Sequence, residues 1–127
     1  MQIKIASVFV DDQEKALQFY TEVLGFVKKQ DVAAGGYRWL TVGGADDASG
    51  AELLLEPGAH PAARQFQQAI YADGIPATAL FSADFQAEYE RLRQRGVRFK
   101  SEPMRAEWGI SVLFDDTCGN WINLVQV

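Results

Sequence analysis

The eight residues "FDDTCGNW", residues 114–121, gather side chains that do chemistry in many proteins. Two adjacent carboxylates, Asp115 and Asp116, could bind a cation or transfer a proton. Aspartate, glycine and asparagine are also the residues that close tight turns. We therefore interpret the stretch as a hairpin turn. In it the two carboxylates accept local backbone N–H groups, Gly119 supplies a positive φ, and Asn120 tolerates similar geometry.

The chain contains one cysteine, Cys118, and one histidine, His60. A reactive thiol needs a nearby cation or helix N-terminus, and neither is evident beside Cys118, so we expect an inert turn residue. His60, in "PGAHPAA", has two readings: a ligand or base at the rim of a cleft, or a surface residue near a helix N-terminus. We favour the second, because a single unpaired histidine carries little information.

The composition bounds the class of protein. The 127 residues suggest one compact domain, with 48% hydrophobic and 23% charged residues. A net charge of −5 argues against nucleic-acid binding. There is no apolar run of about 18 residues that would span a membrane, and the N-terminus lacks the pattern of a signal peptide. A single cysteine excludes an internal disulfide, so a reducing cytoplasm is the simplest location.

The first half of the chain predicts a strand, a helix and three further strands. Asp12 is a good N-cap, the apolar residues after it recur at helical spacing, and Gly25 is suited to end the helix. Segments of β-forming residues bounded by turn signals predict strands. The predicted strands cover residues 3–10, 26–33, 37–43 and 51–57, and a bridging helix covers residues 61–72.

The second half repeats this order. Residues 5–12 align with residues 77–84, so Asp84 becomes a second N-cap, 72 residues after Asp12. Two βαβββ units in tandem are a strong internal repeat for so short a chain. We assign residues 1–58 to the first module, 59–75 to a helical linker and 76–127 to the second module, all within one domain.

This pattern resembles the vicinal oxygen chelate superfamily, which includes glyoxalase I, bleomycin-resistance proteins and extradiol dioxygenases. "VDDQEKALQFYTEVLGF" looks like the family's opening strand and helix, and "FDDTCGNWINLVQV" like its closing hairpin. The resemblance implies an α+β fold in which the two modules form a curved mixed sheet around a cleft. It also implies a homodimer.

Enzymes of that superfamily usually hold a divalent metal through a histidine on the first strand and a glutamate on the last strand of a module. The matching positions are Ile5, Ala77 and Asn123, with Glu52 or Leu54 as the fourth. One carboxylate does not make a stable transition-metal site, so we expect no metal and no other cofactor. A metal held by displaced ligands stays an alternative.

Alternation along the strands predicts which side chains face the cleft. The tryptophans could stack on a ring, or hold a cation if Glu52 or Glu56 lies nearby. The competing interpretation is that the aromatic residues only fill the core. The predicted ligand-binding residues are Ser7, Phe9, Trp39, Thr41, Glu52, Leu54, Phe81, Trp121 and Asn123.

We expect a metal-independent protein that binds a small molecule, aromatic or cationic, as the resemblance to bleomycin-resistance proteins implies. The alternative is a glyoxalase-like lyase or isomerase, or a dioxygenase-related enzyme. In that reading, Glu52 in an apolar cleft has a raised pKa and acts as a general base. A third possibility is a dimeric scaffold whose cleft is vestigial. The expected partners are a small molecule and a second copy of the chain, without nucleic acid or membrane.

Overall fold

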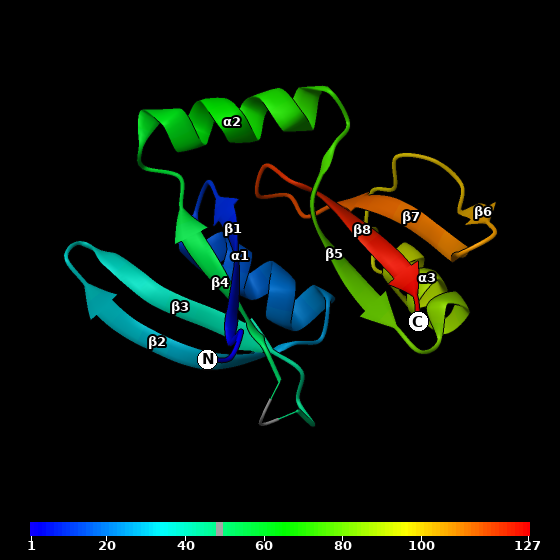
Figure 1. Cartoon of the computed structure of the whole chain (residues 1–127), viewed down its shortest axis with the longest axis horizontal. Helices are drawn as coiled ribbons and strands as arrows, with labels where there is room; N and C mark the ends of the chain where they lie inside the picture. Colours follow the sequence, from blue (N-terminus) through cyan, green and yellow to red (C-terminus); the bar gives the residue numbers. More distant parts are fainter. Residues whose placement is uncertain (48–49) are drawn as a thin grey trace. The chain divides into compact units, whose positions relative to one another are not determined.

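The computed structural model describes residues 1–47 and 50–127. The chain forms two compact units, Met1–Gln65 (unit 1) and Phe66–Val127 (unit 2), and each contains one four-stranded sheet (Figure 1). The boundary falls inside helix α2 (Pro61–Ala72), at the position of the predicted bridging helix. Within the described residues, no helix has the length and apolar character needed to cross a lipid bilayer.

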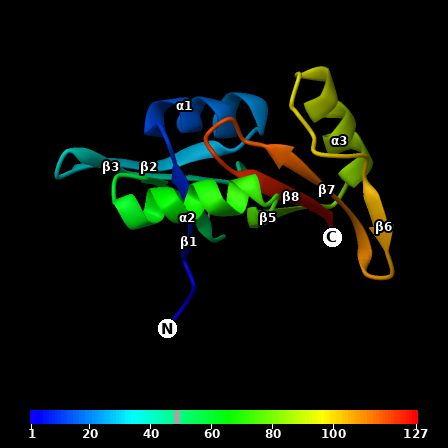
Figure 2. The same cartoon turned by 90° about the horizontal axis from the view of Figure 1, so that it is seen from above.

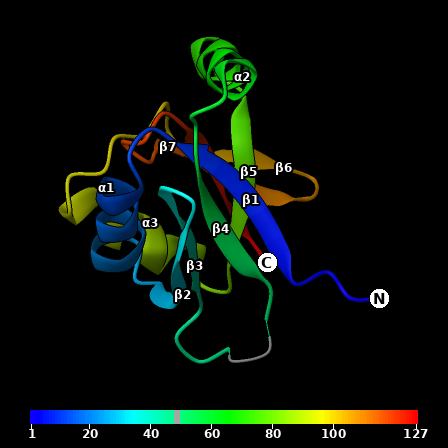
Figure 3. The ribbon, with the colours of Figure 1, turned by 90° about the vertical axis from the view of Figure 1, so that its left-hand side faces the viewer.

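Unit 1 has the predicted order of strand, helix and three strands. The sheet order is β1-β4-β3-β2, with β1 parallel to β4 and the other neighbours antiparallel. Figure 3 shows β1 and β4 running side by side, with α1 to one side of the sheet. The elements are β1 (Ile5–Val10), α1 (Gln13–Gln18), the π-helical segment η1 (Phe19–Val23), β2 (Val27–Ala34), β3 (Tyr37–Gly43) and β4 (Glu52–Pro57).

The core of unit 1 lies between its sheet and α1, which Figure 2 shows over β2 and β3. Apolar side chains that alternate along the strands are buried there against Ala16 and Tyr20. We call the other face of the sheet, away from α1, the distal face of unit 1. The buried strand residues on the α1 side are Val8, Val10, Leu40, Val42 and Leu55.

Unit 2 repeats this architecture, with sheet order β5-β8-β7-β6 and β5 parallel to β8. Its core lies between the sheet and α3, whose residues Phe85, Tyr89 and Leu92 are buried as the helical spacing predicts. The face away from α3 is the distal face of unit 2. The elements are β5 (Pro76–Ser82), α3 (Phe85–Gln94), β6 (Met104–Ala106), β7 (Gly109–Asp115) and β8 (Trp121–Gln126).

The α+β class and the two βαβββ modules are therefore confirmed, as are both predicted N-caps. Asp12 Oδ1 accepts the Lys15 N–H at 3.0 Å, and Asp84 Oδ1 accepts the Ala87 N–H at 3.1 Å. The first helix differs from a regular α-helix in its last turn, which is π-helical. This wider turn lets the consecutive Phe19 and Tyr20 both point inward, with their ring centroids 5.8 Å apart.

Candidate functional site

The distal face of unit 1 brings together the polar and aromatic side chains that the sequence singled out there. Strand pairing sets Ser7 opposite Leu54, and Leu54 opposite Thr41, so these three share one row across the sheet. Trp39 lies two residues from Thr41 along β3, on the same face. Thr41 and Leu54 are buried, Ser7 is exposed, and the Trp39 side chain is 40% exposed.

A chain of hydrogen bonds links Trp39 to Glu52 across this face. The Trp39 indole N–H donates to Gln30 Oε1 at 3.2 Å, and Gln30 Nε2 donates to Glu52 Oε1 at 2.7 Å. The Thr41 hydroxyl donates to the same Glu52 oxygen at 2.6 Å. The indole is thus held in one orientation, beside a carboxylate whose Oε1 is shared by two neutral donors.

The prediction of a raised pKa for Glu52 is wrong. Hydrogen bonds from Thr41 and then Gln30 lower the pKa of Glu52 below its ordinary value, and they outweigh the opposing effect of burial. Both donors stabilise the ionised form of the carboxylate. Glu52 is therefore charged at neutral pH, and it is a weaker base than an apolar setting would make it, which disfavours the general-base alternative.

The backbone beside Trp39 is held by a glutamine that the sequence does not single out. Gln13, at the start of α1, donates from Nε2 to the carbonyls of Arg38 at 2.8 Å and Leu55 at 2.9 Å, and accepts the Arg38 N–H at 3.1 Å. Its side chain thereby joins β3 to β4 beyond their last registered pair, Thr41 with Leu54. No pattern in the sequence marks a single glutamine for this task.

Arg38 points away from the distal face, as alternation predicts, and pairs with acids. Its guanidinium donates two hydrogen bonds to Asp31, at 3.0 and 2.8 Å, and lies 3.7 Å from Glu14. These bonds lower the pKa of Asp31 from 3.8 to about 2. The arginine ties β2, β3 and α1 together immediately before Trp39.

Gln30 was also not predicted as a site residue, because β2 is irregular at this point. The pairing of β2 with β3 shifts by one residue between Lys28 and Gln30, so β2 carries an irregularity there. Counting alternate residues along β2 from the sequence therefore gives no reliable face beyond this point. Only the register in the structure brings Gln30 opposite Thr41.

In unit 2 the distal face presents three of the predicted residues in different settings. Phe81 on β5 is 66% exposed, and Asn123 on β8 is half-buried opposite Ala79. Trp121 is only 4% exposed, because the Tyr71 ring of α2 stacks on it at 5.3 Å between centroids. Its indole N–H donates to the Tyr71 carbonyl at 3.2 Å.

The stretch 114–121 is a tight turn that binds α2. Asp115 accepts the Thr117 N–H at 2.7 Å, and Asp116 accepts the N–H groups of Cys118 and Asn120 at 2.8 and 3.0 Å, as expected of turn carboxylates. Gly119 has the predicted positive φ, 98°. The second left-handed residue is Thr117 and not Asn120, which instead donates its side-chain amide to Asp116 at 2.8 Å.

Side chains of α2 complete this turn. Gln67 Nε2 donates to the Cys118 carbonyl at 3.1 Å and to Asn120 Oδ1 at 3.2 Å. The Tyr71 hydroxyl donates to Asp115 at 2.7 Å, and this bond is the main reason why the pKa of Tyr71 is raised. Cys118 itself is fully buried. The cluster that looked chemical in the sequence is a docking point for a helix.

The four positions that the resemblance assigns to a metal do not fit one. Ile5 and Ala77 offer no donor atom, Asn123 offers only an amide, and Glu52 already accepts two hydrogen bonds. The register also makes Leu54, opposite Ser7, the counterpart of Asn123, which lies opposite Ala79. Across residues 1–47 and 50–127, no three His, Cys, Asp or Glu side chains gather closely enough to hold a metal ion.

His60 lies at the start of α2 and is exposed, as the preferred interpretation expected. Its Nδ1 accepts the Ala62 N–H at 3.0 Å, so the ring caps the helix. Within residues 1–47 and 50–127, no hydrogen bond joins it to a site residue predicted from the sequence.

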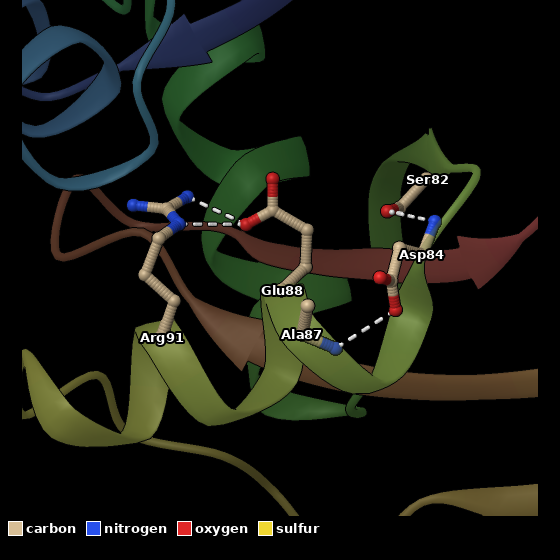
Figure 4. Close-up of a pocket in the computed structure, with 5 residues that line it drawn as sticks. All are labelled: Ser82, Asp84, Ala87, Glu88 and Arg91. Carbon is tan, nitrogen blue, oxygen red and sulfur yellow. Dashed lines mark hydrogen bonds and ion pairs between the residues drawn. The ribbon is translucent and has the colours of Figure 1, made fainter.

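A depression of about 220 Å³ lies where β5 meets α3 (Figure 4). Its polar groups are occupied: the Ser82 hydroxyl accepts the Asp84 N–H at 3.1 Å, Asp84 caps α3, and Glu88 pairs with Arg91 at 2.7 Å. None of the predicted ligand-binding residues lines it. These groups therefore cap and stabilise α3, and we assign no ligand to the depression.

Comparison with known proteins gives a consistent result. A model of the Glyoxalase/Bleomycin resistance protein/Dioxygenase superfamily matches residues 2–124. The chain is 52% identical over 126 residues to the uncharacterized protein YurT of Bacillus subtilis (strain 168), covering 99% of both proteins. Among solved structures it is similar to UcmS2, with a TM-score of 0.84 and 35% identity over 98% of this chain and 97% of that one. It is also similar to TnmS3, an antibiotic binding protein from Streptomyces sp. CB03234, with a TM-score of 0.78 and 31% identity over 99% and 95% of the two chains.

Proposed function

The chain belongs to the Glyoxalase/Bleomycin resistance protein/Dioxygenase superfamily, and from this membership we propose that it binds a small organic molecule directly, without a metal ion. The observation that carries the proposal is the exposed indole of Trp39 on the distal face of unit 1, fixed by its hydrogen bond to Gln30. The exposed Ser7 and the ionised Glu52 lie on the same face as polar neighbours of the ligand.

Trp39 offers a flat apolar surface for a ring. Its Cα partner across the hairpin, Val32, is 58% exposed, and Phe9 on β1 is half-buried. A large exposed indole that is held in one orientation loses little entropy when a planar ligand stacks on it. The ligand is therefore flat or partly apolar. Thr41 lies beneath it, buried, and supports Glu52 through its hydroxyl.

Glu52 adds a negative charge to this surface. Its lowered pKa keeps it ionised at neutral pH, and both neutral donors contact the same oxygen, Oε1. A carboxylate beside an aromatic face favours a ligand that carries a positively charged group. An aromatic or cationic small molecule is the ligand class that this surface suits.

The relatives support the same class. TnmS3 is an antibiotic binding protein, and this chain is 31% identical to it over nearly its whole length. We extend that activity to this chain as a proposal: the ligand is an organic molecule of antibiotic size. Two facts favour binding over catalysis: the 31% identity to TnmS3, and Ile5 and Ala77 at positions where enzymes of the family carry a metal ligand.

Phe81, Trp121 and Asn123 are proposed to contact a ligand on the distal face of unit 2. Phe81 contributes an exposed ring and Asn123 an amide that is not fully buried. The ring of Trp121 is almost inaccessible, so its role is indirect: it holds in place the side chains that cover it, such as Tyr71.

We also propose a homodimer in the cytoplasm. Support comes from large apolar side chains that unit 2 exposes outside the proposed ligand contacts, such as Phe66 at 58% and Met104 at 68%. The one cysteine, which is buried, agrees with a reducing compartment. Light scattering at micromolar concentration gives twice the monomer mass if the dimer forms, and a monomer mass refutes it.

The function is tested by a thermal-shift screen of chelator-treated protein against planar aromatic compounds in cationic and neutral forms. Compounds that raise the melting temperature are then titrated against Trp39→Ala and against Trp108→Ala, a matched change of an exposed tryptophan in unit 2. We expect Trp39→Ala to weaken binding by about tenfold or more, since buried aromatic contacts dominate binding energies, and Trp108→Ala to leave it unchanged. Ligands that bind only after a metal is added back contradict the proposal.

A further inference from the structure

The segment that follows α3 presents two cations on the distal face of unit 2. It runs antiparallel to β7: the Lys100 N–H donates to the Leu113 carbonyl and the Asp115 N–H to the Arg98 carbonyl, both at 2.9 Å. Phe99 turns toward α3 and packs edge-on against Tyr89, with centroids 4.8 Å apart. Alternation therefore sends Arg98 and Lys100 together to the other face.

Both cations lie against the same indole. The guanidinium carbon of Arg98 is 5.3 Å, and the Lys100 ammonium 5.2 Å, from the Trp121 ring centroid. Gly74 leaves room for this arrangement, because a Cβ at its position would lie 2.7 Å from Lys100 Cε and 2.8 Å from Nζ. The end of the lysine side chain thus lies between the Trp121 ring and the backbone of Gly74.

The nearby carboxylate, Asp115, already accepts hydrogen bonds from other groups. Asp115 Oδ1 accepts the Thr117 N–H and its Oδ2 accepts the Tyr71 hydroxyl, both at 2.7 Å, while Arg98 lies farther off, at 3.5 Å. The Arg98 side chain is 70% exposed. Among residues 1–47 and 50–127, the Lys100 ammonium has no hydrogen-bond or ion-pair partner. Two positive charges therefore meet one carboxylate, in a chain whose net charge is −5.

The internal repeat makes this pair informative. Leu54 and Asn123 are counterparts in the two sheets, so Glu52 and Trp121, each two residues earlier, are counterparts as well. Unit 1 has a carboxylate at this position and unit 2 an indole covered by two cations. The fold needs neither, because the same architecture forms in both units.

We propose that Arg98 and Lys100 form a binding site for an oxyanion, the carboxylate or phosphate group of a small molecule. The planar guanidinium matches two oxygens of such a group, and the ammonium adds a point charge beside it. An oxyanion would relieve the repulsion between the two cations and supply the acceptor that Lys100 lacks. The site lies within unit 2 and does not depend on the function proposed for Trp39.

The test uses the full chain, with inorganic phosphate and acetate as probes at constant ionic strength set by sodium chloride. Binding is followed by NMR, from the backbone N–H of Lys100 and the indole N–H of Trp121. We expect saturable shifts, weakened about tenfold or more in Arg98→Gln/Lys100→Gln. A response to phosphate alone indicates a phosphate ligand, and a response to acetate alone a carboxylate ligand.

Two further variants keep the test decisive. Arg105→Gln removes an exposed arginine on β6 of the same unit and should leave binding unchanged. Lys100→Arg keeps the charge and should retain binding, which separates loss of the site from loss of the fold. The proposal is overturned if the double variant binds both probes as the parent protein does, or if sodium chloride alone produces the same shifts.

Discussion

At the scale of single residues, Glu52 shows how neighbours decide the chemistry of a side chain. An isolated carboxylate on an apolar strand face would have a raised pKa. Thr41 and Gln30 reverse this by donating to it at 2.6 and 2.7 Å. The ionised carboxylate is then suited to attract a cationic ligand group and poorly suited to abstract a proton.

Thr41→Val removes the hydroxyl that contributes most to the lowered pKa of Glu52. The folded-state pKa of Glu52 should rise, and part of the stability that the carboxylate contributes above its unfolded pKa should be lost. In the parent protein this contribution disappears as the pH falls through the lowered folded-state pKa. NMR titration of the Glu52 carboxyl carbon measures the midpoint.

Thr41→Ser keeps a hydroxyl and is the matched control, so its midpoint should stay close to that of the parent protein. A parent midpoint above the ordinary glutamate value, or an unchanged midpoint in Thr41→Val, contradicts this account of Glu52.

At the scale of elements, side-chain amides hold parts of each unit in place. Gln13 bonds both β3 and β4, and Gln67 joins α2 to the turn before β8. Strands, helices and both N-caps could be predicted from the sequence, since alternation, helical spacing and turn residues are local signals. The roles of Gln13 and Gln67 could not, because an amide bonds whatever the fold brings near it.

Gln13→Ala removes three hydrogen bonds to the backbone of β3 and β4. We expect the free energy of unfolding to fall by about 1–3 kcal/mol, because partly buried backbone groups lose their partners. Urea denaturation measures the loss. Gln18→Ala, at an exposed position of the same helix, should change stability by less than about 0.5 kcal/mol. Equal losses in the two variants would show that Gln13 is not the join between the strands.

Gly119→Ala tests how tightly α2 docks on the turn. The residue has φ 98°, and a Cβ there would lie 2.7 Å from Gln67 Nε2, whose side chain is buried. We expect a loss of about 3 kcal/mol, from backbone strain plus the displaced glutamine. Gly35 also has a positive φ, 58°, but no atom lies within 4 Å of a Cβ built there. Gly35→Ala therefore introduces backbone strain without a clash, and it should lower the free energy of unfolding by about 1 kcal/mol. Similar losses in denaturation experiments would contradict the clash.

At the scale of the whole molecule, one sequence repeat has produced two units with the same architecture and different surfaces. The family and the fold could be predicted from the repeat, the helix caps and the closing hairpin. The surfaces were predicted less completely, because the bulge in β2 hid Gln30 and the docking of α2 covered Trp121. The two units differ in the side chains on their distal faces: unit 1 presents Trp39 with Glu52, and unit 2 presents Arg98 with Lys100.

The central claim is that Trp39 contacts a small molecule without a metal ion, and its indole N–H reports on this directly. NMR spectra of chelator-treated protein resolve the indole N–H signals of Trp39, Trp108 and Trp121, which Trp39→Phe and Trp108→Phe assign. We expect ligands that raise the melting temperature to shift the Trp39 signal, whose N–H donates to Gln30, and to leave the Trp108 signal in place. A Trp39 signal that stays unmoved at saturation, or ligand binding that disappears when metal is removed, would contradict the account.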